Sequence, residues 1–342
     1  MFKNFEIDNK LPKAVYLQII DNIIAQIESG TLKENDPLPS MNELASRLGV
    51  SMETVKKSYK LLRDKGMLLS SQGLGFFAHR KDDNAPLKIF LLFDKLSTYK
   101  LVLFRSFITG IEKKADITIH LHNQDLALFE NLVANALDKY DYYIITPHFQ
   151  TKDPARLLKI VSKIPNRKLL VLDKDIDDLK GNYGLVDQHF MEDAFNAVSS
   201  ESERLRKYDR IVVISASGSM YHEAILKGME MAMSIANLNY TVCDGFNESM
   251  MKKGTLFIVV CGQLDSEHFA ILRSVKDNGL KLGEDVGVIS YNDSPENEFI
   301  CNGLATMSTD FQEMGTIAAR MINSGEMEKV HNRFRLIPRS SL

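Results

Sequence analysis

The sequence predicts an α/β protein in two parts, a small helical head that ends in a β-hairpin and a large body of parallel sheets. Residues 1–79 show three apolar helical patterns followed by two short apolar runs around a Gly-x-Gly tip. Residues 87–342 alternate between strand and helix patterns, which is typical of doubly wound parallel sheets with helices on both faces. The polar residues 80–86, which end in proline, are the expected linker. Because the body is too long for one open sheet of this kind, we expect two lobes.

The composition is that of an ordinary globular protein. The chain has 342 residues, of which 44% are hydrophobic and 25% are charged. Its longest apolar runs, residues 89–93 and 256–261, are far shorter than the roughly 20 residues that span a bilayer. The N-terminus lacks an apolar signal core, and the three cysteines lie far apart, which argues against export, a disulfide framework and a CxxC metal site. We therefore expect a cytoplasmic protein.

Each helix expected in the head has its own sequence signal. Apolar residues recur every four positions from Val15 to Ile27, which predicts one amphipathic helix. Ser40 can cap a second helix, and Glu43, three residues later, completes a capping box. Ser51 can cap a third helix. Three helices and a hairpin, with the second and third helices joined by a short turn, constitute a winged helix-turn-helix.

Positive charge is concentrated in the second half of the head. Residues 47–80 carry seven basic and two acidic residues, whereas residues 1–46 carry four basic and seven acidic ones, within a chain of net charge −3. On charge alone, a solvated helix face explains this stretch as well as a nucleic-acid-binding surface does. The basic residues, however, fall on the third helix and the hairpin, and a third helix of this fold can enter the major groove of DNA. We therefore expect double-stranded DNA as a partner.

Several short sequence words in the head occur in a fixed order. They are Tyr16-Leu-Gln-Ile19, Ile27-Glu-Ser-Gly30, Leu38-Pro-Ser40, Glu43-Leu-Ala45, Leu48-Gly-Val-Ser51, Thr54-Val55, Gly66 and Gly73-Leu-Gly75. With these words, residues 12–77 resemble the DNA-binding head of the GntR family of bacterial transcription regulators. The resemblance and the helix pattern together predict the DNA-binding residues, which are Ser40, Asn42, Ser51, Met52, Glu53, Thr54, Lys56, Lys57, Lys60, Gly73 and Gly75.

Three of these positions depart from the family pattern. Asn42, Met52 and Lys56 stand where the family usually has arginine. Arginine makes a bidentate contact with guanine that methionine cannot make and that lysine makes less specifically. We therefore expect an operator richer in A·T pairs than the family's usual one. Lys56, Lys57 and Lys60 are expected to contact phosphates.

Three stretches of the body carry a second set of sequence words. Residues 278–293 read NGLKLGEDVGVISYND, and residues 304–307 and 336–340 read LATM and LIPRS. They are similar to the periplasmic-binding-protein-like effector domain of LacI-type regulators. The resemblance implies two lobes hinged around a small ligand, commonly a sugar. The full expectation is an N-terminal winged helix-turn-helix followed by a two-lobed periplasmic-binding-protein-like domain with doubly wound parallel sheets.

Ligands of open α/β sheets bind beyond the carboxyl ends of the strands. The polar and aromatic residues that follow the expected strands are therefore the candidates for effector binding. Acids, amides and hydroxyls can bind the hydroxyl groups of a sugar, and an aromatic ring can pack on its C–H face. For each residue alone, a helix cap or a solvated loop position is an equally good interpretation. Ile225 stands where the resembling family has a ligand-binding arginine, so a non-sugar effector stays open. The expected effector-binding residues are Asp94, Tyr99, Thr146, His148, Asp173, Ser217, Tyr221, Gln263 and Asp293.

The sequence predicts no metal ion, no cofactor and no membrane contact. His120 and His122 share one face of an expected strand, but a third metal ligand at a fixed spacing is missing. An enzyme would need a recognisable catalytic motif, and neither a nucleophile elbow nor a phosphate-binding loop occurs in the chain.

The predicted function is that of a sequence-specific bacterial transcription regulator, expected to be a repressor, that acts as a homodimer on a palindromic operator. A small molecule between the lobes, with a monosaccharide favoured, would control DNA binding. Two alternatives stay open. One is a DNA-binding head fused to an enzyme body of the aminotransferase type, for which the sequence shows no suitable cofactor lysine or phosphate cup. The other is a regulator that senses a non-sugar metabolite.

Overall fold

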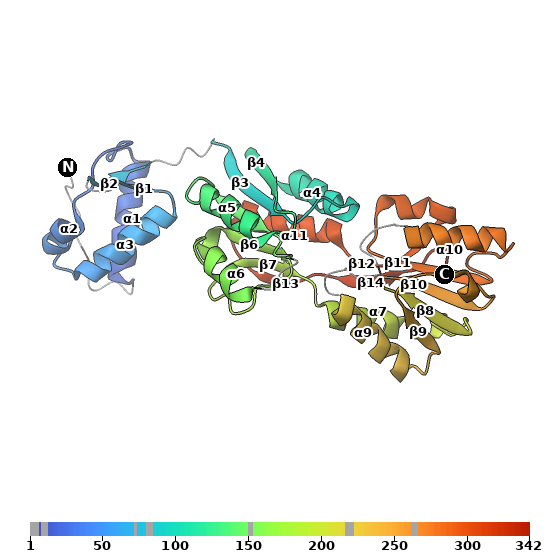
Figure 1. Cartoon of the computed structure of the whole chain (residues 1–342). Helices are drawn as coiled ribbons and strands as arrows, with labels where there is room; N and C mark the ends of the chain where they lie inside the picture. The colour runs from blue at the N-terminus through green and yellow to red at the C-terminus, as the bar shows by residue number, and fades with distance from the viewer. Residues whose placement is uncertain are drawn as a thin grey trace. The chain divides into compact units, whose positions relative to one another are not determined.

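The structure is a computed structural model that divides into two compact units, Met1–Ala85 and Pro86–Leu342 (Figure 1). We call the first unit the head and the second the body. Within the described part of the chain, no helix is both long enough and apolar enough to cross a lipid bilayer. The described residues are 7, 13–71, 74–79, 85–149, 153–215, 222–260 and 266–342.

The head is a winged helix-turn-helix, as the sequence predicts. Its helices and strands are α1 (Val15–Glu28), α2 (Met41–Leu48), α3 (Met52–Asp64), β1 (Leu68–Ser71) and β2 (Gly75–Ala78). β1 and β2 pair antiparallel, from Leu68 opposite Ala78 to Ser71 opposite Gly75, and form the predicted hairpin. The apolar stripe of α1 packs against α2, α3 and the hairpin in one core.

The predicted caps of α2 and α3 are both present. The Ser40 hydroxyl accepts a hydrogen bond from the Glu43 N–H at 3.2 Å, and the Ser51 hydroxyl accepts one from the Thr54 N–H at 3.1 Å. Each bond satisfies an N–H group that has no partner inside its own helix. Gly49 ends α2 in the left-handed region, with a φ of 63°, and this turn sets the direction in which α3 leaves.

The body has two lobes, each built on a six-stranded sheet. The N-lobe strands are β3 (Leu87–Phe93), β4 (Ala115–Leu121), β5 (Tyr142–Ile145), β6 (Leu169–Asp173), β7 (Gly184–Asp187) and β13 (Lys329–His331). The C-lobe strands are β8 (Arg210–Ile214), β9 (Tyr240–Cys243), β10 (Thr255–Val259), β11 (Val286–Tyr291), β12 (Ala305–Thr309) and β14 (Phe334–Ile337). The N-lobe order is β13-β7-β6-β5-β3-β4, and its described pairs are parallel. The C-lobe order is β14-β12-β11-β10-β8-β9, with β14 antiparallel to β12.

Helices cover both faces of each sheet, as the alternating pattern predicts. The N-lobe contains α4 (Thr98–Gly110), α5 (Leu126–Ala136), α6 (Pro154–Val161) and α11 (Phe311–Ser324), and the C-lobe contains α7 (Phe190–Ser200), α8 (Ser202–Leu205), α9 (His222–Ile235) and α10 (Ser266–Asp277). Short 3₁₀ turns lie at Asn166–Lys168, Glu248–Met250, Pro295–Glu298 and Ile300–Asn302. α4 and α11 pack on one face of the N-lobe sheet, and α5 and α6 pack on the other (Figure 1). In the C-lobe, α7 and α9 lie opposite α10.

The chain crosses between the lobes three times. It leaves the N-lobe after β7, returns from β12 into α11, and leaves again from β13 into β14. Asn332 joins these segments, because its N–H donates to the Asp187 carbonyl at 2.9 Å and its side-chain amide donates to the Asp310 carbonyl at 3.0 Å. The Asp310 N–H donates in turn to the Arg333 carbonyl at 2.9 Å. We call these crossing segments, residues 187–190, 309–311 and 331–334, the hinge.

α11 and α4 pack closely because Gly315 has no side chain. A Cβ atom there would lie 2.3 Å from the Leu103 carbonyl oxygen and 2.9 Å from the Phe107 nitrogen. We predict that Gly315→Ala lowers the free energy of unfolding of the body, measured by urea denaturation, by about 1–3 kcal/mol, the usual cost of overpacking. Gly245→Ala is the control, because a Cβ atom there would be 3.7 Å from the flexible Glu267 carboxylate. Equal stability of the two variants would contradict this packing.

Candidate functional site

The exposed side of α3 carries most of the predicted DNA-binding residues. Val55, Tyr59 and Leu62 are buried in the head core and fix which side of the helix faces solvent. Gly75, at the start of the second hairpin strand, is exposed, and Gly73 lies outside the described residues. The structure therefore leaves a polar, mostly basic surface available to a nucleic acid. The other predicted residues are exposed Ser40, Asn42, Ser51, Met52, Glu53, Lys56, Lys57 and Lys60, and half-buried Thr54.

Two of the α3 lysines have neighbours within the head. Lys56 Nζ lies 3.5 Å from Glu53 Oε2, and Lys57 Nζ lies 3.7 Å from the centroid of the Tyr16 ring. Interactions between exposed groups of this kind contribute roughly 0–1 kcal/mol. Phosphate oxygens can therefore replace them at little cost.

Buried polar side chains gather beyond the carboxyl ends of the N-lobe strands. The Lys100 ammonium forms an ion pair with Asp94, and the Asp94 N–H donates to the Thr146 hydroxyl at 2.9 Å. His148 Nε2 lies 2.9 Å from Asp173 Oδ2. The other oxygen, Asp173 Oδ1, accepts a hydrogen bond from the side-chain amide of Gln188. We call this group the N-lobe polar cluster; its buried members are Asp94, Lys100, Thr146, His148, Asp173 and Gln188.

The charges of this cluster stabilise one another. Burial raises the pKa of Asp173, but His148, Lys100 and Gln188 outweigh this effect and lower that pKa to about 2. Burial lowers the pKa of Lys100 to about 8, against the opposing effect of Asp173. Burial also lowers the pKa of His148, so its neutral ring can donate the Nε2–H to Asp173. At neutral pH the cluster therefore contains charged groups that are shielded from water. Electrostatic interactions are stronger in such a buried environment than in water.

A tyrosine of the C-lobe approaches the N-lobe polar cluster. Tyr291 ends β11, and burial, followed by the nearby carboxylates of Asp193 and Asp173, raises the pKa of its hydroxyl. Among the described residues, the hydroxyls of Tyr291 and of Ser215 at the end of β8 have no hydrogen-bond partner. A buried hydroxyl without a partner costs roughly 1–3 kcal/mol. A ligand with polar groups between the lobes would satisfy such hydroxyls.

Five of the nine predicted effector residues lie in or beside the N-lobe polar cluster. Four are members of it, and Tyr99 adds a ring that packs on Phe311 with ring centroids 4.5 Å apart. The pKa of Tyr99 is raised, by burial first and then by Asp173, which places its hydroxyl near the cluster. The five residues are Asp94, Tyr99, Thr146, His148 and Asp173.

The other four predicted effector residues are not in this group. Asp293 is bound by Arg339 through two hydrogen bonds, of 2.9 Å and 2.8 Å. Its carboxylate is therefore engaged within the C-lobe, where Asp293 also lines a hollow of about 260 Å³ with residues of α4, α11 and β14. Ser217, Tyr221 and Gln263 lie outside the described residues.

Four polar residues in or beside this cluster were not predicted from the sequence. Lys100 and Gln188 belong to the cluster itself, Gln124 Nε2 donates to Asp94 Oδ2 at 3.4 Å, and His122 Nε2 lies 3.0 Å from the Thr146 carbonyl. Lys100 carries a usable signal, because it stands in the first turn of the helix that follows β3, and that turn lies beside the strand end. Gln188 directly follows β7 and offers the same signal.

Asp94 and Lys100 depend on each other for charge neutralisation. We predict that Asp94→Asn or Lys100→Met alone lowers the free energy of unfolding of the body by about 3–5 kcal/mol, because each change leaves a buried charge unpaired. The double variant is expected to lose clearly less than the sum of the two single changes. Urea unfolding of the full chain measures all three. Strictly additive losses would mean that the two groups do not form an ion pair.

Two family models match the chain. Residues 15–78 match the bacterial regulatory proteins of the gntR family, and residues 205–342 match the periplasmic binding protein-like domain. The matched families are those of regulatory and binding proteins rather than enzymes, which argues against the alternative of an aminotransferase-like body.

Relatives of known name match the head. The histidine utilization repressor of Pseudomonas aeruginosa is 30% identical over 89 residues, which are 26% of this chain and 36% of that protein. The transcriptional repressor NagR of Bacillus subtilis is 34% identical over 74 residues, 22% of this chain and 30% of that protein. The mannosyl-D-glycerate system repressor MngR of Escherichia coli is 38% identical over 80 residues, 23% and 32% of the two chains. This chain thus spans about a third of the length of these relatives.

Solved structures match the body. A dimeric lac repressor with an 11-residue C-terminal deletion has a TM-score of 0.57 at 15% identity and covers 75% of this chain and 98% of its own. A lac repressor dimer bound to operator and the anti-inducer ONPF has a TM-score of 0.56 at 15% identity, with 75% and 94% covered. The Escherichia coli repressor ascG has a TM-score of 0.56 at 14% identity, with 75% and 99% covered. At these identities the likeness shows the fold, which is the two-lobed one that the sequence predicts.

The chain therefore joins a winged helix-turn-helix head that matches the gntR family model to a body that matches the periplasmic binding protein-like model and has the fold of the lac repressor core.

Proposed function

We propose that the protein is a cytoplasmic transcription repressor that acts as a homodimer on a palindromic DNA operator and releases it when a small molecule binds between the lobes. One observation carries the proposal: a head with an exposed basic α3 is joined to a two-lobed body whose N-lobe strands end in a buried polar cluster. The head relatives reported above are named as repressors. The solved lac repressor dimer bound to operator has the same body fold.

A monosaccharide is the effector that we favour. The carboxylates of Asp94 and Asp173 can accept hydrogen bonds from vicinal hydroxyls, the Lys100 ammonium can donate to them, and the Tyr99 ring offers an apolar face. A non-sugar metabolite is the second candidate, because Ile225 is buried in the C-lobe core. The C-lobe therefore lacks, at that position, the ligand-binding arginine that the family resemblance implies.

The coupling between ligand and DNA depends on the angle between the lobes. A ligand that contacts both the N-lobe polar cluster and Tyr291 favours the closed arrangement of the lobes. Closure changes the spacing or the order of the two heads of a dimer, and operator half-sites tolerate only one spacing. The shift in the free energy of DNA binding cannot exceed the difference in ligand-binding free energy between the two arrangements, typically about 1–3 kcal/mol.

The role of α3 predicts a specific salt dependence. Lys60→Ala is expected to weaken binding to operator and to unrelated DNA alike and to reduce the slope of log affinity against log salt by about one unit, because one phosphate contact is lost. Fluorescence anisotropy of labelled duplexes measures both. Lys276→Ala, which removes an exposed charge from α10 of the body, is the matched control. An unchanged salt slope for Lys60→Ala would show that this lysine does not contact the DNA.

The effector class is tested by thermal shift of the full chain against monosaccharides, deoxysugars, sugar phosphates and non-sugar metabolites. A ligand at 100 times its Kd is expected to stabilise the body by about 2.7 kcal/mol. His148→Gln should abolish that shift, whereas His120→Gln on β4 should retain it. A shift with non-sugars alone would rule out the sugar. If the ligand still raises the melting temperature of His148→Gln, it binds outside the N-lobe polar cluster.

A further inference from the structure

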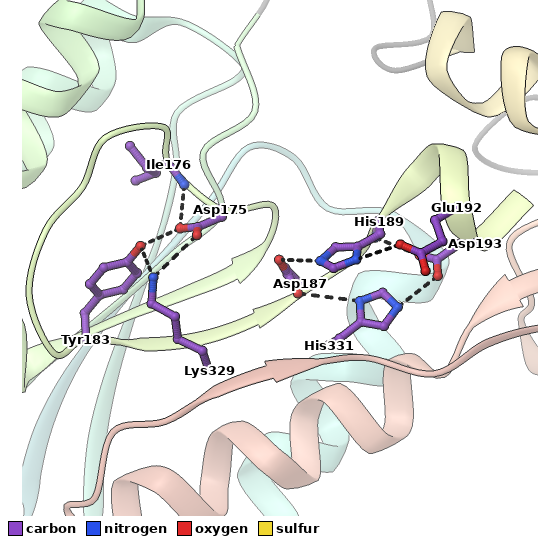
Figure 2. A network of polar contacts seen from close by, with 9 residues as sticks. All are labelled: Asp175, Ile176, Tyr183, Asp187, His189, Glu192, Asp193, Lys329 and His331. Carbon is purple, nitrogen blue, oxygen red and sulfur yellow. Dashed lines mark hydrogen bonds and ion pairs between the residues drawn. The ribbon is translucent and has the colours of Figure 1, made fainter.

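Two histidines and three carboxylates meet in the hinge, beside the N-lobe polar cluster, because Asp187 pairs with Asp173 in the β6–β7 ladder. Asp187 ends β7, His189 directly precedes α7, and His331 ends β13. They therefore belong to two different crossing segments, which Asn332 joins through the Asp187 carbonyl. Figure 2 shows the two imidazole rings beside the single Asp187 carboxylate, with Glu192 and Asp193 on the other side of the rings.

The spacing of the inner atoms is that of metal ligands rather than of hydrogen-bond partners. His189 Nε2 lies 3.4 Å from Asp187 Oδ2, and His331 Nδ1 lies 3.7 Å from Asp187 Oδ1. Hydrogen bonds between such groups are about 2.7–3.2 Å long. Two ligands of one tetrahedral zinc ion, each about 2.0–2.2 Å from the metal, are about 3.4 Å apart. One ligand atom from each of the three residues lies within 4.8 Å of the other two.

The outer contact of His331 has the arrangement that supports a metal-binding histidine. His331 Nε2 lies 3.0 Å from Oδ1 of the buried Asp193 carboxylate, whereas His189 Nδ1 lies 3.5 Å from Glu192 Oε2, which is too long for a hydrogen bond. A carboxylate that accepts the remaining N–H fixes the ring and its tautomer, so that the other nitrogen is free to bind metal. Asp193 is itself held in place, because it accepts the His189 backbone N–H at 2.8 Å.

The two histidine side chains are accessible to solvent, and their rings stack on each other. The His189 and His331 side chains are 48% and 41% exposed, so an ion can enter from solvent, while Asp187 is buried. The rings stack with centroids 4.0 Å apart and planes 28° apart.

We propose that Asp187, His189 and His331 bind one Zn²⁺ ion in the hinge, with a fourth position open to water. Two imidazoles and one carboxylate are a donor set that suits zinc and other late transition metals rather than Mg²⁺ or Ca²⁺, which prefer oxygen ligands. The sequence predicts no metal, and no local ligand spacing indicates this site, because His331 lies far along the chain from Asp187 and His189. The ion would tie the β7–α7 crossing to the β13–β14 crossing and so restrict the movement of the lobes. This last consequence rests on the proposed function; the metal site itself does not.

The direct test is calorimetric titration of the chelator-treated full chain with ZnCl₂. We expect one Zn²⁺ per chain for the wild type, and loss of that binding in His189→Ala and in His331→Ala, whose partly exposed side chains can be removed without unfolding the body. His79→Ala is the matched control, because among the described residues His79 forms its ion pair with one carboxylate, Glu34, at 2.7 Å, and it should retain the wild-type stoichiometry. MgCl₂ should give no saturable heat.

Two results would overturn the proposal: no saturable zinc binding by the wild type, or wild-type binding by both hinge variants. Asp193→Asn gives a graded readout, because loss of an outer carboxylate should weaken zinc binding about 10–100-fold rather than abolish it. X-ray absorption at the zinc edge of the loaded chain should show imidazole ligands. Operator binding measured with and without zinc then tests the regulatory consequence. Its failure would leave the zinc stoichiometry unaffected, so the two outcomes can be distinguished.

Discussion

The hydrogen bonds of Asn332 are the constraint on which the two-lobed body depends. This buried residue binds the carbonyls of Asp187 and Asp310, so one side chain and its backbone hold three crossing segments in register. Each lobe has its own sheet and its own core, and the hinge is where both lobes share hydrogen bonds. Movement of one lobe relative to the other must therefore be accommodated by rotation about these segments rather than by their separation.

The placement of the buried polar groups follows from this architecture. The carboxyl ends of β3, β5 and β6 meet at one edge of the N-lobe sheet, and the N-lobe polar cluster occupies that edge. Buried charges cost several kcal/mol unless they are paired, and Asp94 with Lys100 and Asp173 with His148 meet this condition within one lobe. Among the described residues, buried hydroxyls without a hydrogen-bond partner remain in both lobes, at Ser97 before α4 and at Ser215 and Tyr291 at strand ends of the C-lobe. A ligand that bridges the lobes would offer these hydroxyls polar partners.

Much of the fold and part of the N-lobe polar cluster could be predicted from the sequence. The caps at Ser40 and Ser51 and the strand ends at Asp94 and Asp173 are local signals, readable from a few neighbouring residues. The pairing of Asp293 with Arg339 could not be predicted, because it joins residues 46 positions apart. The proposed zinc ligands of the hinge could not be predicted from the sequence for the same reason. Their proximity depends on β13 pairing with β7 across most of the body, which no local pattern encodes.

We propose that a small molecule acts from the N-lobe polar cluster, through the hinge, on the head. Hydrogen exchange of the full chain, measured by mass spectrometry with and without the effector, reads out all three regions in one experiment. We expect slower exchange at the ends of β3, β5 and β6 and in the hinge segments, together with altered exchange in α3 of the operator-bound chain. Protection confined to other parts of the body, with the hinge and the head unchanged, would contradict it.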